Sequence, residues 1–171
     1  MIINDCVNLT PKGEVEINFI SKKNGKIINY VNHNLVVNEG RRKIVDLLLD
    51  KANITKMVIK KDSSINENTV PPSSQATDTF SSVFGNSYIL SAIRNISGVY
   101  EDDEGKALDN PKIQFVSIFD CDNIDCFVNQ IGLVIESEGV NYLFALFSLD
   151  RSYDLRADQD MIIQVIWRIS F

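Results

Sequence analysis

Apolar and polar residues alternate strictly near the start of the chain, in the segment EVEINFI (residues 14–20). A period of two places the apolar side chains on one face, as in a half-buried strand. The pair Asn24-Gly25 follows, and a type I′ turn favours this dipeptide because both of its central residues adopt positive φ. We therefore expect a β-hairpin over residues 14–37, with an antiparallel return strand.

The period then changes to that of a helix. Asn38 can accept hydrogen bonds from the free amides of a first helical turn, and the glutamate after it favours the positive end of the helix dipole. Ile44, Leu47 and Leu48 share one helical face. One amphipathic helix is predicted over residues 39–51.

A polar loop containing Pro71-Pro72 follows a short strand. Proline removes backbone donors, so this loop cannot continue a sheet. Asp78 could cap a short helical turn over residues 78–84, which Gly85 would end.

From residue 87 onward, runs of β-branched and aromatic residues alternate with gaps rich in Asp, Asn and Gly. Their regular spacing favours antiparallel pairing over parallel βαβ units. The sequence therefore predicts a single, mainly β domain over residues 1–171. We expect an antiparallel β-sandwich with the longer helix packed on or beside its sheets.

The most apolar stretch is NQIGLVIESEGVNYLFALFSL, residues 129–149. Two apolar runs flank a polar turn, so nearly every side chain on both arms is expected to be buried. A sheet commonly packs one face on its own core, and identical copies in a ring or fibre can cover the other. This predicts that the outer face meets the helix or a neighbouring copy, with interface residues among Leu143, Phe144, Ala145 and Phe147.

The overall composition excludes several classes of protein. Of the 171 residues, 44 % are hydrophobic and 23 % are charged, close to the averages for globular domains. The longest apolar runs are far shorter than the roughly 20 residues of a membrane helix, so no membrane partner is expected. The net charge is −6 and the 17 basic residues are scattered, which disfavours nucleic-acid binding.

Three cysteines, Cys6, Cys121 and Cys126, give an odd number in a chain whose first residues lack the pattern of a signal peptide. We therefore expect reduced thiols in a cytosol. A structural zinc site needs four sulfur or imidazole ligands, and His33 is the only histidine. Buried or half-buried thiols are the favoured interpretation, and no metal is expected.

Candidate catalytic groups are isolated in the sequence. His33 lies between two asparagines, without a local signature of a nucleophile or an orienting acid. Asp120, Asp122 and Asp125 lack the glycine and the glutamate of an EF-hand loop and are interpreted as a polar turn. No P-loop, GxSxG, GxGxxG or HExxH motif occurs. We expect no catalytic residue and no cofactor, and an enzyme is the least favoured hypothesis.

The C-terminal segment MIIQVIWRISF also alternates, which predicts a strand that runs to the last residue. Trp167 lies on its apolar face. We interpret this ring as a core anchor rather than a ligand-stacking group, because aromatic side chains bury large areas in β interiors.

Several short motifs occur in a recognisable order. NLVVNEGRRKIVDLLL carries Asn34 and Gly40 ahead of the predicted helix, and a strand, a Pro/Ser/Thr loop and the pair Asp78-Thr79 follow. A strand bearing Arg94 comes next, then IQFVSIFD, then VNQIGLVIE with glutamine in place of a usual acid, and finally IIQVIWRISF.

In this order, residues 34–171 resemble a family of bacteriophage and phage-tail-like particle structural proteins. The resemblance implies a fibre, baseplate or collar component of a virion, or of a contractile injection system or bacteriocin. Such a subunit would be made in the bacterial cytoplasm and act within the particle, by self-assembly and docking to other tail-particle proteins. The family implies no catalytic residues.

An alternative reading is a carbohydrate- or receptor-binding β-sandwich at the tip of such a particle. Exposed aromatic side chains would then line a groove for a surface glycan. The candidate rings are Tyr88, Tyr100, Tyr142 and Tyr153.

Overall fold

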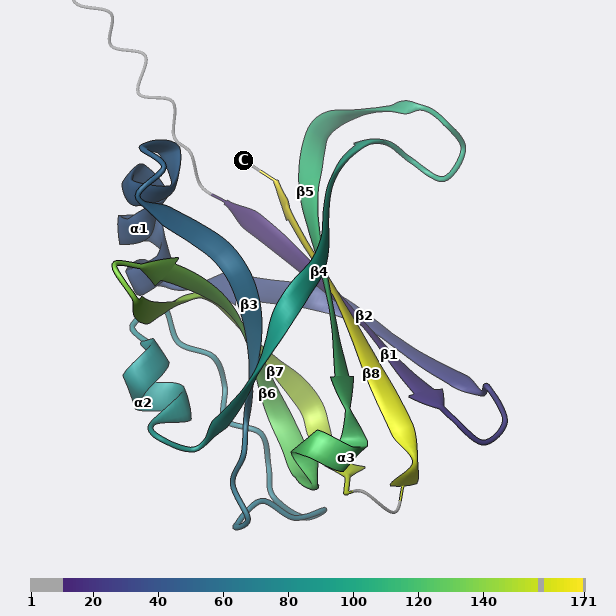
Figure 1. The fold of residues 1–171 in the computed structure, drawn as a ribbon. Helices are drawn as coiled ribbons and strands as arrows, with labels where there is room; N and C mark the ends of the chain where they lie inside the picture. The colour runs from purple at the N-terminus through teal and green to yellow at the C-terminus, as the bar shows by residue number, and fades with distance from the viewer. Residues whose placement is uncertain (1–10, 157–158, 171) are drawn as a thin grey trace, which may run out of the picture.

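Eight antiparallel strands close into a barrel in the computed structural model, which describes residues 11–156 and 159–170 (Figure 1). The order around the barrel is β1-β2-β7-β6-β3-β4-β5-β8. The strands are β1 (Lys12–Ser21), β2 (Ile27–Val36), β3 (Ala52–Lys60), β4 (Tyr88–Glu101), β5 (Ala107–Asp120), β6 (Cys126–Ser137), β7 (Val140–Leu155) and β8 (Met161–Ser170). The helices are α1 (Asn38–Leu48), α2 (Phe80–Phe84) and α3 (Cys121–Ile124).

The predicted β-sandwich is wrong, because the first and last strands pair with each other. β1 and β8 pair through ten residues, from Lys12 opposite Ser170 to Ser21 opposite Met161. This pairing closes the sheet on itself, whereas a sandwich would leave open edges. An inward and outward alternation is common to both architectures, so the period of two could not distinguish them.

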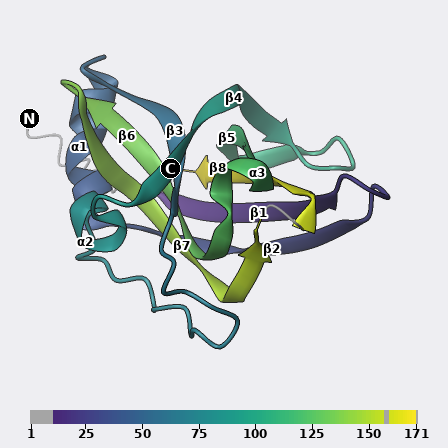
Figure 2. The same cartoon turned by 60° about the horizontal axis from the view of Figure 1, so that its bottom comes forward.

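Register shifts help the long strands to curve around the barrel. β6 and β7 shift at Val128/Gln130 and Leu133/Val134, and β3 and β6 shift at Ile54/Lys56. A bulge of this kind bends a strand and increases its local twist. Figure 2 shows the strands surrounding a common interior.

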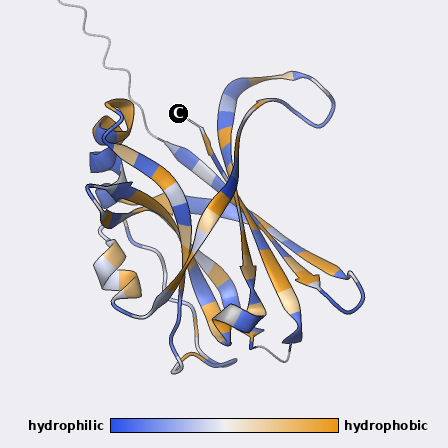
Figure 3. Cartoon of the chain, viewed as in Figure 1, coloured by the Kyte–Doolittle hydropathy of each residue, from blue (hydrophilic) through white to orange (hydrophobic). Residues whose placement is uncertain are grey.

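The expected alternation fills that interior. Val15, Ile17 and Phe19 of β1 are buried, and so are Val165 and Trp167 of β8. Hydrophobic and hydrophilic segments alternate along the strands (Figure 3). The hairpin expected over residues 14–37 is present as β1 and β2, which pair without a register shift.

The predicted helix of residues 39–51 is present as the shorter α1, which ends at Leu48. Asn38 is not its cap. The preceding residue, Val37, takes the cap position without a side-chain hydrogen bond, and Asn38 is already helical. Beyond the helix, Asp50 adopts a positive φ of 57°, which is incompatible with a further helical turn.

The short turn expected over residues 78–84 is present as α2, but Asp78 is not its cap. Thr79 takes that position. Its hydroxyl accepts a hydrogen bond from the Ser82 amide, and the Ser82 hydroxyl accepts one from the Thr79 amide, which forms a capping box. Asp78 instead accepts from the Gln75 amide at 2.7 Å. The outer faces of β6 and β7 pack against this helix through a cluster of buried residues: Val37, Val58, Phe80, Val83, Phe84, Val134, Leu143 and Leu146.

Candidate interaction surface

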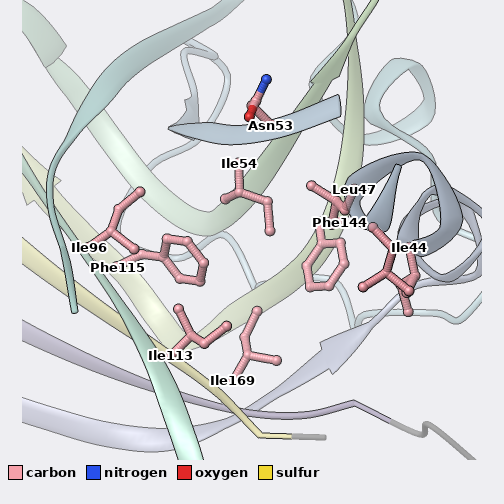
Figure 4. Close-up of a pocket in the computed structure, with 10 residues that line it drawn as sticks. Ile44, Leu47, Asn53, Ile54, Ile96, Ile113, Phe115, Phe144 and Ile169 are labelled. Atoms are coloured by element: carbon pink, nitrogen blue, oxygen red, sulfur yellow. The ribbon is translucent and has the colours of Figure 1, made fainter. Parts of the chain in front are cut away.

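An apolar cavity lies where β4 separates from β3. The two strands pair only between Lys56–Lys60 and Tyr88–Ala92 within the described residues, and β4 continues beyond this point alongside β5 alone. The cavity has a volume of about 410 Å³. Its lining comes from α1 and five strands: Ile44, Leu47, Leu48, Asn53, Ile54, Ile96, Ile113, Phe115, Phe144 and Ile169 (Figure 4).

The lining is almost entirely hydrocarbon. Phe115, Phe144 and Ile169 are buried side chains of the barrel core and form its inner part. Asn53 is the one polar lining residue, and its amide points away from the other lining side chains (Figure 4). Such a surface can bury an apolar group by the hydrophobic effect, but it offers no acid, base or nucleophile for a reaction.

The rim of the cavity is strongly exposed. Leu48 of α1 is 73 % exposed, Ile96 of β4 is 56 % exposed and Ile113 of β5 is 42 % exposed. Isolated exposed apolar side chains are ordinary, but a group that converges from three elements around a hollow marks an interaction site. We call these three residues the cavity rim.

Helix α1 is positioned over this end of the barrel by a glycine. Gly40 is buried, and a Cβ at this position would lie 2.3 Å from the carbonyl oxygen of Phe144. Only a residue without a side chain allows the helix to approach β7 this closely. The approach brings Ile44, Leu47 and Leu48 to the cavity.

Glu39 fixes the same helix to two other elements. Its carboxylate accepts a hydrogen bond from the Leu143 amide at 2.6 Å and another from the Phe80 amide at 2.9 Å. One side chain therefore connects α1 to β7 and to the first residue of α2. The local sequence indicates only that Glu39 favours the positive end of the helix dipole, and no local pattern predicts these distant partners.

The four predicted interface residues are covered within their own chain. Leu143, Phe144 and Ala145 have no exposed surface, and Phe147 is 3 % exposed. Phe144, Ala145 and Phe147 belong to the barrel core, while Leu143 packs in the cluster beneath α2. These four side chains are therefore covered by this chain alone, and a contact with a neighbouring copy through them stays a prediction.

The four candidate glycan-binding tyrosines do not converge on a groove. Tyr153 stacks on Phe19 with ring centroids 4.4 Å apart, and Tyr88 meets Phe80 edge to face. Tyr142 lies beneath the ammonium of Lys43. Tyr100 alone among the four is strongly exposed, at 68 %. Glycan binding stays a prediction, because no two of these four rings are exposed side by side to form a stacking surface.

Two of the three cysteines lie in the described part of the chain. Cys121 and Cys126 are free and buried. Burial raises the pKa of the Cys121 thiol to about 11, and it also raises that of Cys126. Cys6 lies outside the described residues. Within the range that the structure describes, no three His, Cys, Asp or Glu side chains are grouped as metal ligands.

The acidic turn binds a lysine from the first hairpin. Lys22 Nζ lies 2.8 Å from Asp120 Oδ1 and 3.2 Å from Asp122 Oδ2. The hydrogen bond from Lys22 lowers the pKa of Asp120. Asp120 also accepts from the Asp122 amide and caps α3. These carboxylates therefore join the tip of the β1–β2 hairpin to the end of β5.

The other residues singled out in the sequence lie apart from the cavity. His33 is exposed on β2. Trp167 is fully buried, as expected for a core anchor. Gln130 is buried and donates to the Ser148 hydroxyl at 3.1 Å, while Arg94 is exposed on β4.

No helix in the described residues is both long enough and apolar enough to cross a membrane. No family model, no curated protein and no solved structure matches the chain.

Proposed function

We propose that the protein is a structural subunit of a bacteriophage tail or a phage-derived, bacteriocin-like contractile tail particle, and that it acts by docking to neighbouring subunits. One structural observation supports assembly: the cavity rim of Leu48, Ile96 and Ile113 around an apolar hollow. The order of motifs over residues 34–171 supports the assignment to a tail particle.

The apolar cavity rim is better suited to binding another protein subunit than to catalysing a reaction. Apolar surface gains about 25 cal/mol per Å² when it leaves water, so an apolar side chain of an adjoining subunit would be stabilised in the hollow. The cavity is lined by residues from α1, β3, β4, β5, β7 and β8. A neighbour bound there would contact both the helix and the barrel.

The test is incorporation into particles in the native host. A tagged wild-type protein is expected to co-purify with tail-like particles and to be located on them by immunogold electron microscopy. Ile96→Lys places a charge on the rim and should lower incorporation by about tenfold or more. Val70→Lys is the matched control, because Val70 is 83 % exposed and lies outside the cavity lining.

Absence of the wild-type protein from particles would overturn the proposal. Equal incorporation of the two lysine variants would show that the rim is not the docking surface. Circular dichroism and thermal unfolding of each purified variant verify that the barrel is intact.

A further inference from the structure

Strand β2 has a long open edge. One side of β2 pairs with β1 continuously, from Ile27 opposite Ile20 to Asn34 opposite Gly13. On the other side, within the described part of the chain, β2 pairs with β7 only at Leu35 and Val36. Residues 27–34 therefore present a strand edge with no adjoining strand, which can template the addition of another strand.

The edge is uncharged and unprotected. Its sequence is IINYVNHN, which contains no Lys, Arg, Asp, Glu, Pro or Gly. Ile27, Ile28 and Val31 are 58 %, 47 % and 52 % exposed. Natural edge strands are usually guarded by charged side chains, proline or bulges, and the pairing of this strand with β1 has no bulge.

A second open edge in the same chain is guarded. Beyond Ala92, β4 pairs only with β5 among the described strands. This edge carries Arg94, Gly98 and Glu101, and its pairing with β5 shifts register twice. The two edges differ in the features that prevent strand addition.

The proline loop is bonded to two side chains of β7. The Ser148 hydroxyl donates to the Pro72 carbonyl oxygen at 2.6 Å, and the Ser152 hydroxyl donates to that of Thr69 at 2.7 Å. The polar proline loop therefore lies beside β7. None of these bonds reaches residues 27–34 of β2, and a hollow separates residues 32–34 from Ser74 of the loop and Ser148 of β7.

We propose that the open edge of β2 pairs antiparallel with the same edge of a second copy of this chain. The two copies would be related by a two-fold axis near Tyr30 and Val31, which lie at the middle of residues 27–34. The proposal deepens the proposed assembly role, on which it rests, by naming a partner and a surface separate from the cavity rim.

The local distribution of charge permits an identical partner in this orientation. The edge carries no charged residue, so two copies place no like charges opposite each other. The turn before β2 carries Lys22, Lys23 and Lys26, and antiparallel pairing sends the two lysine turns to opposite ends. The two lysine turns therefore do not face each other across the pairing.

An incoming strand would have to displace one local hydrogen bond at this edge. The His33 amide donates to the Asn32 side-chain oxygen at 2.7 Å, and a partner carbonyl would replace this bond. Strand addition gains its affinity from main-chain hydrogen bonds and from burial of alternate side chains. Here those side chains include Val31, half of whose surface is exposed in the single chain.

Sedimentation velocity of the purified full chain over a micromolar concentration series tests the proposal. Wild type is expected to form a dimer. Val31→Lys puts one lysine from each copy beside the two-fold axis and should weaken dimerisation at least about tenfold. Val140→Lys is the matched control, because Val140 is a strand valine outside β2 with nearly the same exposure, 50 %. This change should leave the dimer intact.

Amide hydrogen exchange measures where on the chain the dimer contact lies. Amides within residues 27–34 should gain protection as the concentration rises, and the amides of β4 beyond Ala92 should not. A wild-type monomer throughout the series, equal dissociation by both lysine variants, or protection confined to another segment would overturn the proposal. Protection of residues 27–34 only by a different protein would also overturn it.

Failure of this inference is distinguishable from failure of the proposed function. A soluble monomer that still enters tail particles in a rim-dependent way would overturn only the strand pairing. A β2 dimer that never enters particles would overturn only the particle assignment.

Discussion

The two sides of the barrel are held together in different ways. On one side, β8 pairs with β1 through ten residues and with β5 through nine, and the side chains beneath are fully buried. Around the rest of the barrel, β6 pairs with β7 through eleven residues, but the seams on either side of the β7-β6-β3 sheet are short: β2 meets β7 at two residue pairs and β3 meets β4 at five. We call this sheet with its two seams the open side. Both candidate interaction surfaces, the cavity rim and the edge of β2, lie where paired strands separate. The tightly paired side supplies stability, and the open side carries the two surfaces that we propose for contacts with other copies or subunits.

Trp167→Ala should break the closed side and produce the largest effect. The ring is fully buried between strands β1 and β5, opposite Val15 and Phe115. Its removal leaves a large cavity and should lower the free energy of unfolding by about 3–5 kcal/mol. Guanidinium unfolding followed by circular dichroism measures the loss.

Trp167→Phe is the control for this change. The indole Nε1 atom is buried and has no hydrogen-bond partner in the described part of the structure. Phenylalanine removes that unpaired donor while it keeps much of the ring, so its cost should be clearly smaller than that of alanine. Equal costs would show that the ring does not hold the closed side together by packing.

The strands of the closed side were predictable because their pattern is local. Alternation in residues 14–20 and in the C-terminal segment identified both β1 and β8. Their pairing was not predictable, since Lys12 and Ser170 meet only through the closure of the whole sheet. Alternation specifies which face is buried and leaves open whether the sheet folds over or closes.

Gly40→Ala tests how the open side is covered. The new methyl group would overlap the backbone of Phe144, so α1 must move away from β7. Overpacking of this kind costs about 1–3 kcal/mol, and it should also weaken any binding at the cavity rim. Thermal unfolding and the particle incorporation assay measure the two effects.

Val45→Ala is the matched control on the same helix. Val45 is 60 % exposed, and alanine has the higher helix propensity, so the free energy of unfolding should change little. A similar loss in both variants would show that the contact of Gly40 with β7 is unimportant.

The cavity rim could not be predicted from its residues, although helix α1 was. Ile96 and Ile113 look like ordinary inward positions of a strand, and their exposure arises because β4 parts from β3 at Ala92. Leu143 and Phe144 were correctly expected to be buried, but their cover comes from α1 and α2 through Gly40 and Glu39. These contacts join residues about a hundred positions apart, beyond the reach of local periodicity.

Arg168→Gln tests a charged network on the outer face of the closed side. The guanidinium donates to Glu14 at 3.0 Å, to Glu16 at 2.8 Å and to Gln114 at 2.9 Å, and so links β8 to β1 and β5. The loss should be about 1 kcal/mol at neutral pH, since partly exposed ion pairs contribute little. Chemical unfolding at fixed ionic strength measures it.

The same network has a predicted pH dependence. Burial tends to raise the pKa of Glu16, but hydrogen bonds from Arg168, Asn18 and Asn29, with the charge of Arg168, outweigh it and lower the pKa. The stabilisation is therefore present above the ordinary value of 4.5 and is lost as the pH falls through the lower folded-state value. The difference between wild type and Arg168→Gln should shrink on acidification, and a difference that grew would contradict this assignment.

Asn34→Ala probes the open side and should give the smallest effect. The side-chain oxygen and nitrogen of Asn34 are buried and have no hydrogen-bond partner among the described residues, and the amide packs directly over Gly13. An unpaired buried polar group costs about 1–3 kcal/mol, which offsets the packing that alanine loses. The free energy of unfolding should therefore rise by about 0.5 kcal/mol or stay unchanged. The exposed neighbour Asn32→Ala removes only exposed hydrogen bonds, with the His33 amide and the Tyr30 hydroxyl, and should change it by less than about 0.5 kcal/mol. A loss above about 1 kcal/mol in Asn34→Ala would show that this amide holds β2 against β1. Strand β2 would then be held more firmly than its two residue pairs with β7 suggest.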